Sequence, residues 1–120
     1  MANPNLANVS TGYGAMAFQN VTTVFANILV NSSTSNTILK VNSLLLNNID
    51  AGSNIGNVTL TVSNAGVTYN LLTNVSVPVQ SSMVAITKDS TIYVLEGQYV
   101  QIKASSNNVV HAVASFDTIG

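Results

Sequence analysis

The sequence predicts an all-β protein built from antiparallel sheets, and three observations support that prediction. Short segments alternate apolar and polar residues, turn-forming Gly, Asn and Ser separate them about every 8 to 15 residues, and no segment has a convincing helical period. Parallel strands would need crossover helices. Alternating strands bury their apolar faces by packing two sheets together or by closing one sheet into a small barrel. We therefore expect an antiparallel β-sandwich of about eight strands, of jelly-roll or immunoglobulin-like type.

The first 20 residues are expected to form an irregular N-terminal arm outside the core. They contain one proline, two glycines and four asparagines, without sustained alternation. Residues 21–120 are expected to form the sandwich domain. Residues 21–30 (VTTVFANILV) open this domain as a strand, because β-branched residues favour an extended chain, although apolar residues here also recur at helical spacing.

The central strands follow from the clearest patterns in the chain. Residues 37–47 (TILKVNSLLLN) are apolar on both faces, as expected for a strand inside the sandwich or at a subunit contact. In residues 58–63 (VTLTVS) the three apolar side chains face one way and the hydroxyl side chains face the other. A turn at residues 64–66 uses the freedom of Gly66 and leads into a returning strand, residues 67–77, with a bend near Asn74.

Four shorter strands complete the expected domain. Pro78 cannot pair in a ladder and so marks an edge or a connection. The strands are expected at residues 82–87, 91–95, 99–104 and 109–116. A tight turn, Glu96-Gly97-Gln98, separates the second from the third.

Composition excludes several classes of function. Of the 120 residues, 47% are hydrophobic and only 6% are charged, while 43 are Asn, Ser or Thr. Three lysines and no arginine cannot form a nucleic-acid-binding patch. No window is long and apolar enough to cross a membrane, and the start has no secretory signal, so we expect synthesis in the cytoplasm. The absence of Cys rules out disulfides and Cys-type zinc sites, and the net charge of −1 favours association.

No catalytic, cofactor or metal site is expected. His111 would need a nucleophile and an acid beside it for hydrolysis, but Ser115 and Asp117 lie further along its own strand. Asp89 and Glu96 lie at opposite ends of one strand, too far apart for glycoside hydrolysis. The loop that begins at Asp50 has only a faint likeness to a calcium loop, without its essential glycine and glutamate.

The order of segments from residue 37 onward resembles a family of small virion proteins of tailed bacteriophages. In that family, a strand of the form xYLLxxVxVPxxSS leads to LxxGDxIxVxAS and then to a terminal apolar strand. The corresponding residues here are Tyr69, Leu71, Leu72, Val75, Val77, Pro78, Ser81, Ser82, Leu95, Gly97, Val100, Ile102, Ala104 and Ser105, with Tyr69 one residue before its position in the first pattern and Leu95 one residue after its position in the second. Gln98 stands where the family commonly has Asp. The resemblance implies a β-sandwich that forms part of the phage particle, and it brings no catalytic residues.

We therefore expect a non-enzymatic virion protein, made in the host cytoplasm without a signal peptide. A capsid decoration (cement) protein on the capsid exterior is the first hypothesis, and a neck, tail or fibre subunit is the second. The expected partners are the major capsid protein or neck and tail proteins, and other copies of the chain in a homo-oligomer, but neither nucleic acid nor membrane. A carbohydrate-binding module is the alternative from a different class. The candidate interface residues are Tyr13, Phe18, Phe25, Leu44 and Leu46.

Overall fold

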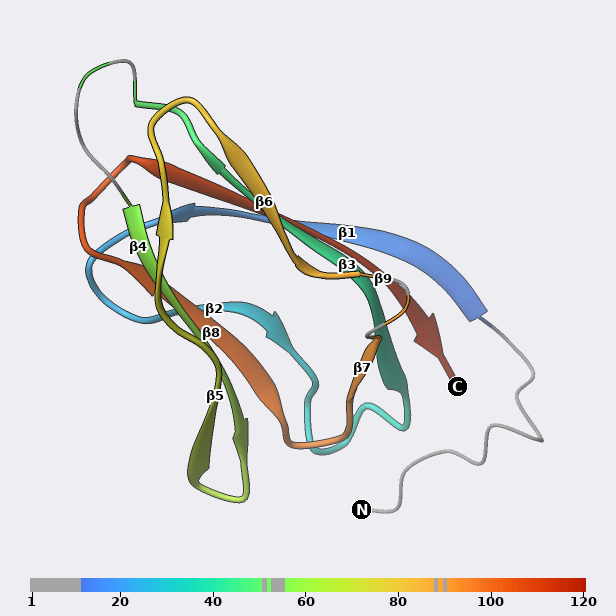
Figure 1. Ribbon diagram of the computed structural model, residues 1–120. Helices are drawn as coiled ribbons and strands as arrows, with labels where there is room; N and C mark the ends of the chain where they lie inside the picture. The colour runs from blue at the N-terminus through green and yellow to red at the C-terminus, as the bar shows by residue number, and fades with distance from the viewer. Residues whose placement is uncertain (1–11, 51, 53–55, 88, 90) are drawn as a thin grey trace.

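The computed structural model describes residues 12–50, 52, 56–87, 89 and 91–120, and it confirms the predicted all-β sandwich. Nine strands form two antiparallel sheets (Figure 1). The strands are β1 (Gly12–Val21), β2 (Ala26–Val30), β3 (Ile38–Asn48), β4 (Gly56–Asn64), β5 (Val67–Val77), β6 (Ser82–Ile86), β7 (Ile92–Val94), β8 (Tyr99–Ala104) and β9 (Val110–Ile119). The described residues contain no α-helix.

The strand order distinguishes a jelly roll from an immunoglobulin-like sandwich. Sheet A has the order β1-β9-β3-β6, with β7 also paired to β3, and sheet B has the order β2-β8-β4-β5. The pairs are nested as in one long hairpin, because β1 pairs with β9, β2 with β8, β3 with β6, and β4 with β5. Rolling that hairpin also pairs β9 with β3 and β8 with β4. This is jelly-roll topology, with the short β7 as an addition.

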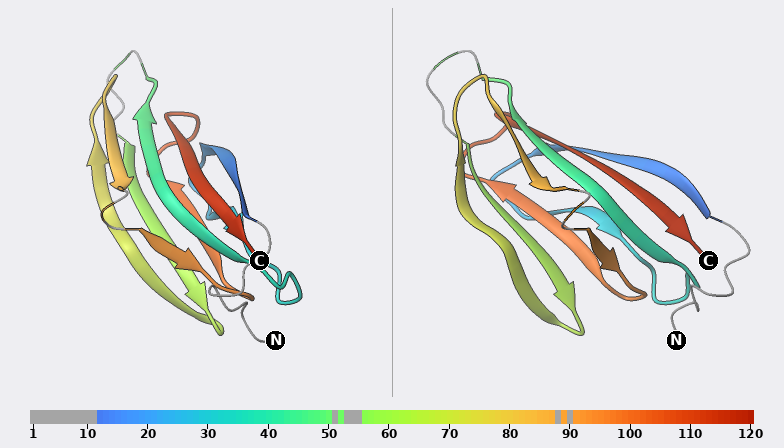
Figure 2. Two further views of the ribbon diagram at one scale, coloured as in Figure 1. Left: turned by 90° about the vertical axis from the view of Figure 1, so that its right-hand side faces the viewer. Right: turned by 45° about the vertical axis from the view of Figure 1, so that its right-hand side comes forward.

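The core lies between the two sheets, which Figure 2 shows as two layers. Its largest fully buried side chains come from both layers. They include Leu44, Leu46, Val41 and Val110 from sheet A and Leu60, Ile102, Val58 and Val100 from sheet B. Side chains alternate inward and outward along β8 as the sequence predicted, with Val100, Ile102 and Ala104 buried. Each sheet consequently has an inner face on this core and an outer face.

The N-terminal arm expected over residues 1–20 is wrong for residues 12–20. These residues belong to β1, which pairs with β9 in an unbroken register from Gly12↔Ile119 to Val21↔Val110. Strand formation here depends on a partner 89 to 107 residues away, so local alternation did not reveal it. Residues 1–11 lie outside the described residues. The expected strand at 21–30 is correspondingly shorter, because β2 begins at Ala26.

Residues with positive φ form the turns and the bend that the sequence predicted. Ala65 and Gly66 have φ angles of 52° and 81° in the β4–β5 hairpin, as two-residue hairpin turns require. Asn74 has a φ of 52° where β5 bends, and its N–H donates to Thr59 Oγ1 at 3.1 Å. Gly97 has a φ of 81° in the turn before β8. These positions set the lengths and directions of the strands that carry the outer faces.

Two buried asparagines hydrogen-bond to backbone groups of segments that connect the strands. Asn31 donates through Nδ2 to the carbonyl oxygens of Thr37 and Val94, at 2.9 and 2.8 Å. Asn48 donates through Nδ2 to the carbonyl of Val77 at 2.8 Å, and its Oδ1 accepts the N–H of Asp50 at 2.9 Å. Buried amides with their hydrogen bonds made hold a chain in one conformation, because leaving those groups unpaired is costly.

The side chains of β4 alternate in direction as predicted, but two hydroxyl side chains on the outer side are buried. Val58 and Leu60 are fully buried as expected, but Thr61 and Ser63 are also buried, at 1% and 3% exposure. The pairing of β4 with β8 is regular, whereas its pairing with β5 shifts register on both sides of Leu60. Thr61 therefore lies on the outer side of sheet B, flanked by Gln101 and Asn70, and is nevertheless shielded from solvent.

Candidate functional site

Four apolar side chains form a row across the outer face of sheet A. Phe18 on β1 lies opposite Val113 on β9, Val113 lies opposite Leu45 on β3, and Leu45 lies opposite Val84 on β6. Phe18 is 70% exposed, Leu45 44% and Val84 49%, and Val113 is half-buried. We call this row the apolar band. It crosses the four main strands of the sheet, so it forms one continuous strip rather than scattered apolar residues.

A polar row borders the apolar band on one side. It consists of the exposed residues Asn20, His111, Asn47 and Ser82, which face one another across the same four strands. Asn20 donates through Nδ2 to Asn108 Oδ1 at 2.8 Å. Amide, imidazole and hydroxyl groups therefore line this border of the band.

On the opposite side of the band, charged residues appear only beyond a first row of uncharged residues. Met16, 57% exposed, lies opposite Ser115. Beyond that pair, Asp117 lies opposite Lys40, and its Oδ2 accepts the Asn42 side-chain amide at 3.1 Å. The charged residues thus lie two rows from the apolar band and leave its centre neutral.

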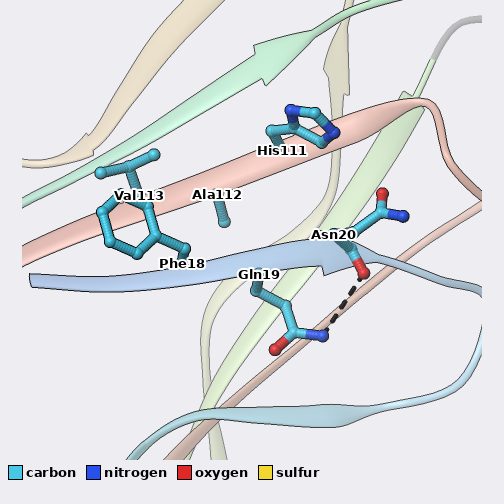
Figure 3. A pocket seen from close by; sticks show the side chains of 6 residues that line it. All are labelled: Phe18, Gln19, Asn20, His111, Ala112 and Val113. Atoms are coloured by element: carbon cyan, nitrogen blue, oxygen red, sulfur yellow. Dashed lines mark hydrogen bonds between the residues drawn. The ribbon is translucent and has the colours of Figure 1, made fainter.

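A shallow depression lies where β1 and β9 meet. Its volume is about 280 Å³, and it is lined by Phe18, Gln19, Asn20, His111, Ala112 and Val113. Figure 3 shows Phe18, Val113 and His111 on one side of the two strands, with Gln19 and Ala112 directed to the other. Small-molecule pockets usually enclose about 300 to 1,000 Å³, so this open hollow is better suited to receiving one side chain or sugar ring.

The surroundings of His111 do not form a hydrolytic triad. Its direct cross-strand neighbours are Asn20 and Asn47. Ser115 and Asp117 lie on the same face but further along β9, opposite Met16 and Gly14. Within the part of the chain that the structure describes, no group of three or more His, Asp or Glu side chains could hold a metal ion.

The three aromatic candidates for the interface are not brought together. Phe18 is in the apolar band. Phe25 lies in the turn before β2, and its ring centroid is 4.8 Å from Lys103 Nζ on β8, so it packs at sheet B. Tyr13 lies on β1 opposite Thr118, and its side chain is outside the part of the chain that the structure describes.

Leu44 and Leu46 are corrected from interface residues to core residues. They are 1% and 0% exposed and lie opposite the buried Ala114 and Ala112. Leu45, between them, is the leucine that reaches the surface. Three consecutive leucines carry no alternation, and register shifts flank this part of β3, so the sequence did not reveal which leucine faces outward. In β9 the sequence did carry a signal. The small apolar residues Ala112 and Ala114 alternate with His111 and Val113, which indicates that the latter two face outward.

The loop at Asp50 connects β3 to β4. Asp50 Oδ2 accepts the N–H of Gly52 at 3.2 Å. The other positions of the calcium-like pattern, residues 51 and 53–55, lie outside the described residues. The carboxylate of Asp50 thus helps to form a turn.

The residues that resemble the phage family form strands and turns. Ser81 donates to the carbonyl of Pro78 through both its N–H and its hydroxyl, at 3.3 and 2.7 Å, and so closes the β5–β6 connection. Gln98, where the family commonly has Asp, accepts the N–H of Leu95 at 2.8 Å and donates to Asn64 Oδ1 at 3.1 Å. Gln98 therefore braces the turn before β8 against the end of β4.

The described residues contain no helix that is long and apolar enough to span a membrane. No model of a known protein family matches the chain, and a search of curated proteins finds no match either.

Proposed function

We propose that this protein is a non-enzymatic structural subunit of a bacteriophage particle that binds the capsid exterior as a decoration protein. The supporting observation is the difference between the central rows of the two outer faces. Sheet A carries the apolar band, while the corresponding row of sheet B is polar: Asn27, Gln101, Thr61 and Asn70. A protein that covers a capsid needs one face for its partner and one face for water.

The outer face of sheet A approaches the size of a standard contact. Three strands of ten or eleven residues and the five-residue β6, with a rise of about 3.3 Å per residue and a spacing of about 4.8 Å, cover roughly 570 Å². Standard protein interfaces bury about 800 Å² on each partner, counted as accessible surface. Phe18 is the largest side chain of the band and the natural anchor for a pocket on the major capsid protein.

Fold and charge agree with this role. Jelly rolls occur in viral capsid proteins and also in lectins, so the topology supports a virion subunit only by analogy. Because the centre of the band is neutral, binding there depends on apolar burial rather than on ion pairs. Attachment to the particle should therefore change little with salt.

Labelling of intact particles tests this proposal. Antibodies against the purified protein should label the outer surface of particles of the phage that carries the gene, and the protein should stay bound at moderate salt. Label that appears only on disrupted particles, or loss of the protein at moderate salt, would contradict the proposal. Hundreds of copies per particle support a decoration protein, and tens or fewer support the neck, tail or fibre alternative.

A carbohydrate-binding module is the second candidate, favoured by the depression beside the apolar band. There an exposed aromatic ring, Phe18, lies next to the amide of Asn20 and the imidazole of His111. Such a combination can stack on a sugar ring and bind its hydroxyls. Specific binding on a glycan array, lost in Phe18→Ala, would favour this candidate, and a blank array would leave the virion subunit.

A further inference from the structure

The four sheet edges of the sandwich differ in how well they are protected. The edge strands β2 and β6 have five residues each, and each has a register shift against its neighbour. The edge strand β5 is longer, but it has two shifts and runs into Pro78. The edge strand β1 pairs with β9 over ten residues without any shift. Bulges, prolines and short length are the usual devices that prevent edge-to-edge pairing, and β1 has none of them.

The composition of β1 adds nothing to oppose pairing. Its sequence, GYGAMAFQNV, contains no charged residue and no proline. Lysines on an edge strand would repel another strand. Among the described residues only β9 pairs with β1, so no described strand lies along its other edge. The Asn20 carbonyl, near the end of β1, accepts the Gln19 side-chain amide at 3.3 Å.

We propose that a second copy of this chain pairs with β1, antiparallel and across a two-fold axis, so that the two A sheets form one continuous sheet. Two residues that lie opposite each other in such a pair must point to the same side of the sheet. Their residue numbers therefore always add up to the same even number. With the axis at Ala17, Met16 lies opposite Phe18 of the partner subunit. The same contact occurs twice.

This register matches the exposed side chains of β1. Met16 is 57% exposed and Phe18 is 70% exposed, and both lie on the outer face. Pairing sets the thioether against one flank of the aromatic ring, a favourable contact, and leaves the outward side of both side chains open. On the inner face Ala17 meets the partner's Ala17, and two methyl groups fit there without a clash. A neutral strand meets its own copy without repulsion, so the chain itself is a suitable occupant.

The inference does not depend on the proposed function, because self-pairing concerns the edge of sheet A and partner binding concerns its outer face. A dimer of this kind extends the outer face across two copies.

A charge series tests both the pairing and its register. The full chain should dimerise in sedimentation velocity as its concentration rises. Met16→Lys with Phe18→Lys places lysine opposite lysine at both contacts and should weaken dimerisation at least about tenfold. Met16→Lys with Phe18→Glu places opposite charges there and should restore dimerisation, in a salt-sensitive form. An axis at Met16 would place lysine opposite lysine in both variants, so only the axis at Ala17 separates them.

A single cysteine gives an independent geometric test, because the natural chain has none. Directly opposite residues have Cα atoms about 4.5 to 5.5 Å apart, within the span of a disulfide. Ala17→Cys should therefore cross-link to a dimer under oxidising conditions. Val84→Cys, on the opposite edge of the sheet, should not cross-link.

Three results would overturn the proposal. The first is a natural chain that stays monomeric at every concentration tested. The second is a Lys/Glu variant as monomeric as the Lys/Lys variant while both keep the melting temperature of the natural chain. The third is loss of the dimer in Val84→Lys, which would assign the contact to the outer face or to another edge.

Discussion

The central cross-strand rows of the two outer faces differ in chemistry. In sheet A the central cross-strand row is the apolar band, with Phe18, Leu45 and Val84 exposed. In sheet B the corresponding row consists of amide and hydroxyl side chains, among them Asn27 and Gln101. Exposed apolar side chains also occur at sheet B, such as Phe25, Val30 and Tyr69, but none of them lies in that central row.

On the proposed function, this difference gives a protein with few charges one row for a partner and one row for water. Amides and hydroxyls hydrogen-bond to water without net charge, so sheet B can face solvent. An apolar strip that crosses a whole sheet marks a contact surface. The share of hydrophobic residues, 47%, does not show this difference, because it counts core and surface residues together.

The largest effect should come from the core that both faces share. Leu60→Ala should lower the free energy of unfolding by about 2 to 5 kcal/mol, because the side chain is fully buried and the substitution leaves a cavity. Leu45→Ala, at an exposed position of the apolar band, should cost less than about 1 kcal/mol. Denaturant unfolding measures both values, and equal losses would mean that Leu45 is not on the outer face.

Substitutions at two neighbouring asparagines should differ in their effect on stability, because one side chain is buried and the other lies in the exposed polar row of sheet A. Asn48→Ala removes the hydrogen bond to the Val77 carbonyl and should cost about 1 to 3 kcal/mol, because that buried carbonyl loses its partner. Asn47→Ala, in the exposed polar row, should change stability by less than about 0.5 kcal/mol. Thermal unfolding of the two variants checks the contrast, which disappears if both melt like the natural protein.

A lysine on each outer face tests the difference in function. Leu45→Lys puts a charge in the centre of the apolar band and should weaken binding to particles at least about tenfold, or about 1.4 kcal/mol. Gln101→Lys puts the same charge on sheet B and should leave binding unchanged. Co-sedimentation with particles measures both variants. Equal loss from the two would show that the faces do not differ in role.

The smallest effect concerns a buried hydroxyl on the polar side. Thr61 Oγ1 has no hydrogen-bond partner in the described structure, so Thr61→Val should raise stability by about 1 kcal/mol. Thr59→Val is the matched control on the same strand, and it should lower stability by about 1 kcal/mol, because Thr59 Oγ1 accepts the N–H of Asn74. The two variants should shift the denaturation midpoint in opposite directions. A loss of stability in Thr61→Val would mean that the Thr61 hydroxyl does make a hydrogen bond.

The surface was harder to predict from sequence than the fold. Phe18 was identified as a candidate interface residue and does lie exposed in the apolar band. Leu45 was missed because TILKVNSLLLN is apolar on both faces and register shifts interrupt β3. Val84 was missed because its exposure depends on where β6 pairs along β3. Which side of a strand meets the core is a property of its pairing.

Local chemistry determined what the sequence could show: the extended segments, the turns at Gly66 and Gly97, and the bend at Asn74. Alternation and positive φ are properties of neighbouring residues, so they can be recognised within a few positions. The tertiary structure alone decided the nested jelly-roll pairing, the inclusion of β1 in sheet A, and which of 17 asparagines are buried. These features depend on contacts between residues far apart in the chain, and a shift of one position in pairing exchanges the core side of a strand for the solvent side.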